Sequence, residues 1–108
     1  MSPITTHVLD TALGRPGAGV AATLYHGDQV VGRGVTNDDG RIADLLPTGA
    51  PPLGEYRLVF DTAGYFKKTG REGFFPRVEI HFEVRPGEPH YHVPLLLSPF
   101  GYSTYRGS

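Results

Sequence analysis

The segment from Val78 to Val84 alternates apolar and polar side chains through seven residues. A period of two places every second side chain on the same face, which is typical of a strand with one buried face. Pro86 and Gly87 follow it and favour a turn. Such a segment is not stable alone, because its apolar face needs further strands or a helix to cover it. The chain is therefore expected to form a packed sheet.

Further β-prone segments are separated by residues that favour turns. Residues 20–25 and 29–31 flank Gly27-Asp28 and predict a hairpin. Asn37-Asp38-Asp39-Gly40 predicts a second turn, since Asn, Asp and Gly tolerate the backbone conformations that reverse a chain. Residues 55–60 predict another strand, with its aromatic and leucine side chains on one face. These segments extend the expected sheet to most of the chain.

Only residues 61–68 favour a helix, with Asp61 or Thr62 as its cap, and Gly64 weakens that expectation. Fifteen Gly and ten Pro in 108 residues mark frequent turns. Seven or eight strands at spacings of roughly ten residues suggest a β-sandwich. The expected fold class is all-β, a two-sheet sandwich with one short helix, in a single domain over residues 1–108.

The composition excludes several classes of function. Ten Lys and Arg against eleven Asp and Glu leave a formal net charge of −1, so neither nucleic acid nor an anionic membrane is an expected partner. The chain has no cysteine, which removes disulfides, thiolate nucleophiles and zinc–thiolate sites. Its first residues lack the pattern of a signal peptide, and residues 93–97, its longest apolar segment, are too few to span a bilayer. A cytoplasmic location is expected.

Residues 91–97 form an unusual segment that is apolar on both faces after His92. Pro94 has no N–H to donate to a ladder and therefore favours a strand near the edge of a sheet. Such a strand with two apolar faces needs a second surface to cover it, and exposed apolar patches of this kind usually mark interfaces. An oligomer is therefore expected.

Five histidines, a few arginines and a polar tail are the candidates for chemistry, since the familiar nucleophile-elbow, phosphate-loop and His-Glu-x-x-His motifs are absent from the sequence. His90 and His92 are two residues apart, so both imidazoles can share one face of a strand. Paired histidines often begin a zinc site, but no cysteine or obvious carboxylate ligand accompanies them, and no metal is expected. A neutral His acting as general base or orienting donor fits better. The alternative is that His90 is a solvated loop residue.

His7, Arg41 and the tail each allow a functional and a purely structural interpretation. A histidine beside apolar residues, like His7, is more often a core or surface group than an active-site residue. Arg41 follows the turn at Gly40 and either donates to a ligand oxygen or is only a surface charge. Residues 102–108 suit a terminal strand in which Gly107 permits close approach of the backbone, or an edge strand with a polar end.

Four motifs in order along the chain resemble one family. They are Thr6-His7-Val8-Leu9-Asp10-Thr11, Thr36-Asn37-Asp38-Asp39-Gly40-Arg41, Phe74-Phe75-Pro76, and the closing segment from His90-Tyr91-His92-Val93-Pro94 to Tyr105-Arg106-Gly107-Ser108. Together they resemble the transthyretin-related proteins, and within these the 5-hydroxyisourate hydrolases, from about Thr5 to the last residue. Each motif alone is weak, but four in this order are specific.

The resemblance implies a transthyretin-like β-sandwich that assembles as a homotetramer, a dimer of dimers with active sites between the dimers. It implies that His7, Arg41, His92, Tyr105 and Ser108 line the site. The implied reaction is the hydrolysis of 5-hydroxyisourate to 2-oxo-4-hydroxy-4-carboxy-5-ureidoimidazoline on the way to allantoin, without a cofactor. Either His92 or His7 would deprotonate water, Arg41 would orient the substrate, and Tyr105 would close the pocket. Ser108 would hold the water or a histidine through its hydroxyl or a terminal carboxylate.

Two other interpretations stay open. The first is a transthyretin-type carrier of a small aromatic hormone, because a fold does not dictate a function. A carrier needs an apolar channel, however, and has no use for two histidines and an arginine around a polar heterocycle. The second is a metal-binding protein that uses His7, His90 and His92.

Overall fold

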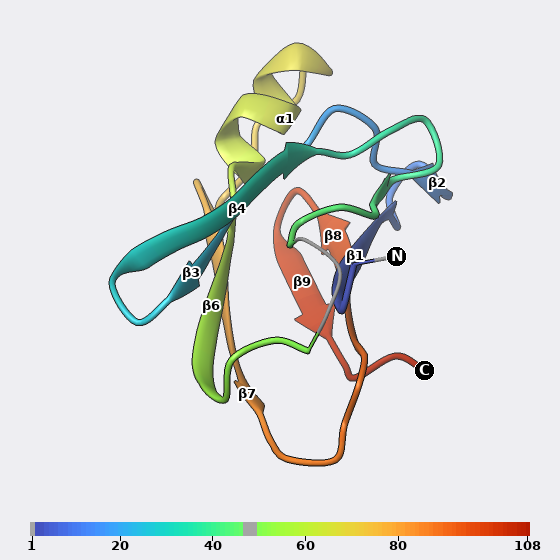
Figure 1. The fold of residues 1–108 in the computed structure, drawn as a ribbon. Coiled ribbons are helices and arrows are strands. Elements are labelled where there is room, and N and C mark those ends of the chain that lie inside the picture. Colours follow the sequence, from blue (N-terminus) through green and yellow to red (C-terminus); the bar gives the residue numbers. More distant parts are fainter. Residues whose placement is uncertain (1, 47–49) are drawn as a thin grey trace.

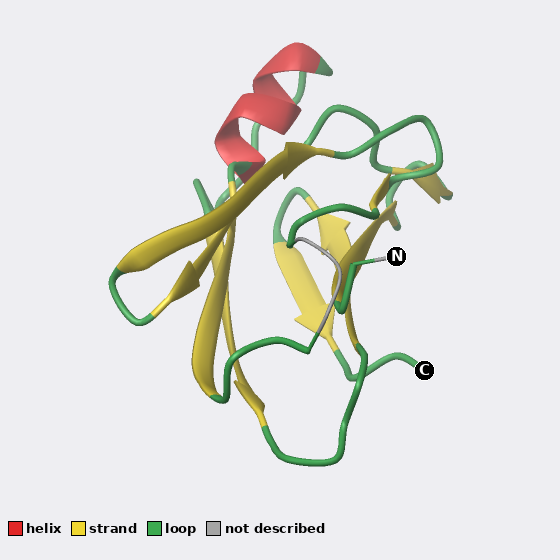
Figure 2. Ribbon diagram, viewed as in Figure 1, coloured by secondary structure: helices red, strands yellow, loops and turns green. Residues whose placement is uncertain are grey.

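The computed structural model describes residues 2–46 and 50–108, which form two facing sheets with one short helix at one end (Figure 1). The first five strands are β1 (Ile4–Asp10), β2 (Arg15–Pro16), β3 (Ala21–His26), β4 (Gln29–Val35) and β5 (Arg41–Ile42). They are followed by β6 (Gly54–Phe60), α1 (Thr62–Lys68), β7 (Val78–Val84), β8 (Tyr91–Ser98) and β9 (Gly101–Thr104). Figure 2 shows how far strands outweigh the single helix. The all-β prediction is confirmed.

The sheets differ in their connections. One has the strand order β4-β3-β6-β7 and is antiparallel throughout. The other has the order β2-β1-β8-β9, with β5 also paired to β1, and its central pair β1–β8 is parallel. Two of the nine strands in the described part of the chain, β2 and β5, have only two residues each, so seven longer strands remain. That number agrees with the seven or eight strands expected.

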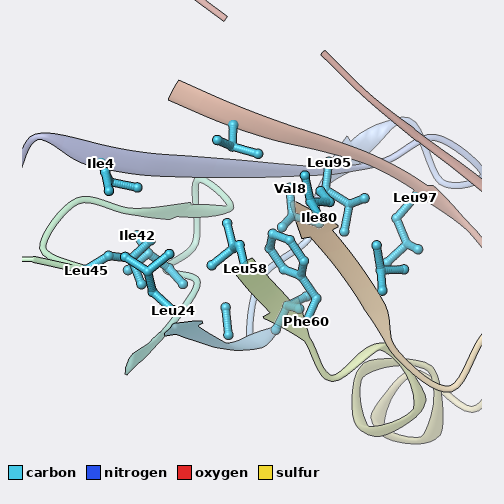
Figure 3. Packing of buried hydrophobic residues seen from close by; sticks show 14 of the residues in the cluster. Ile4, Val8, Leu24, Ile42, Leu45, Leu58, Phe60, Ile80, Leu95 and Leu97 are labelled. Atoms are coloured by element: carbon cyan, nitrogen blue, oxygen red, sulfur yellow. The ribbon is translucent and has the colours of Figure 1, made fainter. Parts of the chain in front are cut away.

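The core fills the space between the two sheets (Figure 3). Every second side chain of β1, β6 and β8 points into it, as their alternating burial shows. Ile4, Val8 and Leu95 from one sheet meet Leu24 and Leu58 from the other, and all five are fully buried. Burial of such side chains contributes roughly 1.5–3 kcal/mol each. The opposite faces of β1 and β8 therefore remain available for other contacts.

Most of the local predictions are confirmed. The alternating segment is strand β7 with the expected bounds, and the first hairpin is β3–β4, closed at Gly27-Asp28. The helix α1 is capped by Asp61, whose carboxylate accepts a hydrogen bond of 3.0 Å from the backbone N–H of Gly64. It has seven residues, and no helix in the described ranges is long and apolar enough to cross a membrane.

The prediction for Pro94 is wrong in one respect, because β8 lies inside its sheet, between β1 and β9. Successive residues of β8 direct their backbone groups to opposite sides of the strand. The N–H of Tyr91 donates to the carbonyl of Pro3 on the β1 side, while the carbonyl of His92 accepts from the N–H of Gly107 on the β9 side. The nitrogen of Pro94 therefore points to the β9 side. The continuous β8–β9 ladder ends at the pair Leu95–Thr104 and resumes only at the bridge to Gly107. The missing N–H falls in that gap.

One buried charge joins β1 to the segment after α1. The carboxylate of Asp10 is fully buried, and Arg71 donates to it at 2.5 Å, Tyr65 at 2.6 Å and the backbone of Leu13 at 3.0 Å. Burial alone raises the pKa of Asp10, but these hydrogen bonds and the charge of Arg71 outweigh it and hold the pKa of the carboxyl below its usual range. A group of this kind stabilises the fold above its unfolded pKa, and the contribution is lost as pH falls through its folded pKa.

Replacing Arg71 by Gln is expected to lower the free energy of unfolding by about 3 kcal/mol or more, because it leaves a buried carboxylate without its cation. Arg77→Gln is the matched control. Arg77 pairs with Glu79 at 3.2 Å in an exposed position, and such pairs contribute about 0–1 kcal/mol. Urea denaturation at one protein concentration measures both. Equal losses in the two variants would show that the Asp10 pair is no more important than a surface ion pair.

Candidate active site

The outer face of the β1–β8 sheet, which points away from the core, carries three of the five predicted site residues. His7 and Arg41 are partners in the antiparallel register of β1 and β5, so their side chains leave the sheet on the same side. Thr5 of β1 and His92 of β8 are partners in the parallel register and share that side. Alternating burial along β1 shows that Thr5 and His7 point away from the core. The fold therefore brings His7, Arg41 and His92 to one surface.

A tight turn fixes the start of β5 and with it Arg41. The side-chain oxygen of Asn37 accepts hydrogen bonds from the backbone of Asp39 at 2.9 Å and of Arg41 at 3.0 Å. Gly40 has a φ of 77°, in the left-handed region, and its carbonyl accepts from the backbone of Val8 at 2.7 Å. A Cβ at Gly40 would collide with the Val8 carbonyl oxygen. The Asn-Asp-Asp-Gly sequence thus sets Arg41 against β1 because only glycine fits this approach.

His92 is half-buried and has a defined partner on one ring nitrogen. Its Nδ1 lies 2.8 Å from the hydroxyl oxygen of Thr5, and the same oxygen lies 3.3 Å from Nε2 of His90. Burial lowers the pKa of His92, and the nearby charges of Arg41, His7 and His90 lower it further. This environment therefore favours the neutral form of the imidazole. A neutral imidazole has one nitrogen able to accept a proton, as a general base requires.

The tail after β9 folds back over β8. The backbone N–H of Gly107 donates to the carbonyl of His92 at 2.9 Å, and a Cβ at Gly107 would lie 2.5 Å from the His92 ring and 3.3 Å from Pro94. The Arg106 guanidinium stacks 4.8 Å from the ring centre of Tyr91 and pairs with a carboxylate of the β7–β8 connection at 3.3 Å. The tail therefore covers Pro94 and leaves no room for a side chain beside His92.

This tail also limits the surface expected to bind another subunit. Pro94 is buried although it points to the outer face, because Gly107 packs on it within the same chain. Leu9 and Leu96 on that face stay only half-buried. Within the single chain, the tail thus covers the outer face of β8 at Pro94 but leaves Leu96 partly exposed.

The two remaining predicted residues lie at the margin of the group. Tyr105 is 58% exposed and lines, with His92, a recess between β7 and the tail at the open edge of the sandwich. Ser108 lines a shallow recess with His90 and Gly107. Within residues 2–46 and 50–108, no hydrogen bond joins Ser108 to Arg41 or His92. The single chain therefore brings Tyr105 and Ser108 to the His92 side of the site and not to Arg41.

Thr5 and Asn37 were not predicted as parts of this site. Thr5 lies two residues before His7, a spacing that places both on one face of a strand, so a signal for it was present. Its contact with His92 depends on the parallel pairing of β1 with β8, which no local pattern predicts. Among the described residues, no group of three or more His, Cys, Asp or Glu is arranged to hold a metal ion.

Known proteins with similar sequences and structures decide the family. The model of the HIUase/Transthyretin family matches residues 4–107. The chain belongs to this family. A Rhizobium meliloti protein named 5-hydroxyisourate hydrolase 2 is 47% identical, and the match covers 97% of this chain and 95% of that protein. The resemblance seen in the four motifs is thereby confirmed.

Solved structures of both branches of the family share the fold. The 5-hydroxyisourate hydrolase of Klebsiella pneumoniae superposes with a TM-score of 0.90 at 40% identity, covering 100% of this chain and 94% of that one. Sea bream transthyretin in complex with thyroxine superposes with a TM-score of 0.88 at 33% identity, covering 97% and 94%. The backbone fold does not separate the two branches, so the side chains of the site must.

The lowered pKa of His92 is open to direct measurement. We expect the titration midpoint of His92 to lie below 6.5 in the free protein. Arg41→Gln removes a nearby positive charge and should move this midpoint upward. Arg77→Gln, one residue before β7 in the other sheet, should leave it unchanged. The carbon-bound imidazole proton resonances, followed by NMR against pH, report the midpoints. A midpoint above 6.5 in the parent protein would contradict the environment described for His92.

Proposed function

We propose that this protein hydrolyses 5-hydroxyisourate, opening its six-membered ring with water. The product is 2-oxo-4-hydroxy-4-carboxy-5-ureidoimidazoline. The observation that carries the proposal is the meeting of His7, Arg41 and His92 on one sheet face, where burial and nearby charges lower the pKa of His92. Similarity to proteins named as 5-hydroxyisourate hydrolases, over 97–99% of this chain, supports it. The reaction is the cleavage of a C–N bond in a cyclic amide.

His92 acts as the general base in this proposal. Its Nδ1 faces the Thr5 hydroxyl, so Nε2 is the nitrogen that would take a proton from water. Because its pKa is lowered, the base form persists at pH values where an ordinary histidine is half protonated. The activated water adds to the ring carbonyl carbon, and the carbonyl oxygen becomes an oxyanion. The proton held by His92 can then pass to the ring nitrogen as the C–N bond breaks.

Arg41 and His7 stabilise the substrate and the oxyanion. The substrate is flat and carries several carbonyl groups, which suit the planar set of N–H donors of a guanidinium. His7 is the register partner of Arg41 and presents a second donor on the same face. Charge stabilisation by fixed donors is usually the largest single contribution in such reactions. We assign orientation of the ring to Arg41 and polarisation of a carbonyl to His7.

We further propose that the site is completed in a homotetramer, a dimer of dimers. The face that carries His7 and Arg41 also carries Leu9 and Leu96, both half-buried in the single chain. A second copy on this face would cover the leucines and enclose the polar groups. Tyr105 and Ser108 would then border the enclosed pocket. The cytoplasmic location expected from the sequence stays a prediction, and a chain without cysteine is compatible with it.

A hormone carrier is the second candidate, because sea bream transthyretin in complex with thyroxine has nearly the same fold. The side chains argue against it. A carrier site for an aromatic hormone needs apolar walls, whereas this face presents a guanidinium and two imidazoles. Saturable binding of thyroid-hormone analogues without any turnover would favour the carrier.

The central test generates 5-hydroxyisourate from urate with urate oxidase and follows its ultraviolet absorbance with and without the protein. Spontaneous decay is subtracted. We expect fast decay with the parent protein and a loss of about 10²–10⁴-fold in kcat for His92→Ala. His26→Ala is the control, since His26 lies at the end of β3 in the other sheet, where its ring stacks on Tyr56. Parent-level turnover in a correctly folded His92→Ala variant would remove His92 from the mechanism.

Gly107→Ala tests the tail. The added methyl would lie 2.5 Å from the His92 ring, so either the ring or the tail must move. We expect kcat to fall about tenfold or more while the melting temperature changes little. Gly101→Ala in the same terminal region is matched to it, because its methyl would find no atom nearer than Ser98 Oγ at 3.7 Å. Similar activity in both variants would show that the tail does not hold His92.

A further inference from the structure

We infer that the hydroxyl of Thr5 is a positioning group that selects the His92 tautomer with its lone pair on Nε2, as one link of a chain from His92 through Thr5 to His90. The inference deepens the proposed hydrolase function and rests on it. Thr5 would touch neither water nor substrate. It would act through the base, by deciding which nitrogen of His92 accepts a proton.

The three side chains are joined by the parallel pairing of β1 and β8. Thr5 and His92 are register partners, and their Oγ1 and Nδ1 atoms lie 2.8 Å apart. His90 precedes β8 by one residue, and its Nε2 lies 3.3 Å from the same oxygen. All three residues are only partly buried, on the outer face of the sheet and at its margin. The Thr5 hydroxyl thus lies within hydrogen-bond distance of both imidazoles.

Proton counting limits what this hydroxyl can do. A threonine hydroxyl has one proton to donate and two lone pairs that accept, and a neutral imidazole donates from one nitrogen and accepts at the other. Thr5 therefore donates to at most one of the two histidines. If it donates to Nδ1 of His92, the proton of that ring is on Nε2, and His92 cannot accept a proton from water. If it accepts from Nδ1–H, Nε2 of His92 is free to accept one.

In the second arrangement both hydrogen bonds of the Thr5 hydroxyl have a donor and an acceptor, and His92 can act as the general base. His92 Nδ1–H donates to Thr5, and the Thr5 hydroxyl donates to Nε2 of His90, which then has its proton on Nδ1. When Nε2 of His92 takes a proton from water, the imidazolium already has an acceptor at Nδ1. No group must reorient as charge develops, which is the condition for effective electrostatic stabilisation. The tautomer of a functional histidine is set in this way by the partner of its other nitrogen.

A purely structural role for Thr5 makes a different prediction. Valine has nearly the same shape as threonine and the same preference for strands, so Thr5→Val should preserve β1. Thr5→Ser loses the methyl group and keeps the hydroxyl. We expect kcat to fall about 10–100-fold in Thr5→Val with KM within about twofold, and to stay near the parent value in Thr5→Ser. Thr11→Val is the control, since Thr11 follows the last residue of β1 and its hydroxyl donates to the backbone carbonyl of Leu97 in β8.

The second measurement needs no turnover. Nitrogen-15 shifts of the His92 ring in the free protein should show a protonated Nδ1 and an unprotonated Nε2. In Thr5→Val this preference should weaken, while Thr5→Ser and Thr11→Val should retain it. Parent-like kcat in Thr5→Val, or a parent His92 protonated on Nε2, would overturn the inference.

The two measurements separate this inference from the proposed function. A parent protein that leaves 5-hydroxyisourate to its spontaneous decay removes the hydrolase proposal, whatever the ring shifts show. The inference then fails as a statement about catalysis. A parent protein that is active while Thr5→Val is equally active removes only the inference. Activity that depends on the Thr5 hydroxyl, together with the expected His92 shifts, supports both.

Discussion

The parallel pairing of β1 with β8 is the contact on which the candidate site depends. It joins residues 4–10 to residues 91–97 in one continuous register. Because registered partners share a face, the same ladder that buries Ile4 and Val8 places Thr5 and His7 next to His92 on the other side. Core packing and site assembly are thus two faces of one pairing. A slip of one residue would send the apolar side chains outward and the polar ones into the core.

Two further contacts lie at opposite ends of this pairing. At one end, the buried carboxylate of Asp10 ties the end of β1 to Arg71 and Tyr65. At the other end, Gly107 bridges to His92 where the ladder to β9 is interrupted by Pro94. The Asp10 contact stabilises the fold, whereas the Gly107 contact stabilises the position of one imidazole.

Local signals predicted the strands and the helix, and long-range pairing accounts for what they missed. The alternation of apolar and polar side chains predicted the bounds of β7 correctly, because burial of one face of a strand determines the pattern of consecutive residues. Pro94 was predicted to lie near a sheet edge because its missing N–H can be read from the sequence. The gap in the β8–β9 ladder that accommodates Pro94 depends on long-range pairing and cannot be read in this way. Family motifs predicted His7, Arg41 and His92. Thr5 was overlooked because its partner is 87 residues away.

The distance along the chain between β1 and β8 also has a consequence for biosynthesis. Residues 4–10 are synthesised before residues 91–97 and cannot form their parallel partner ladder until those residues have been made. Until then, β1 exposes unpaired backbone groups and one apolar face, which makes a nascent chain prone to aggregate. Contacts of such high sequence separation also slow folding. The pairing that brings His7 and His92 together therefore also leaves β1 without its β8 partner until most of the chain has been synthesised.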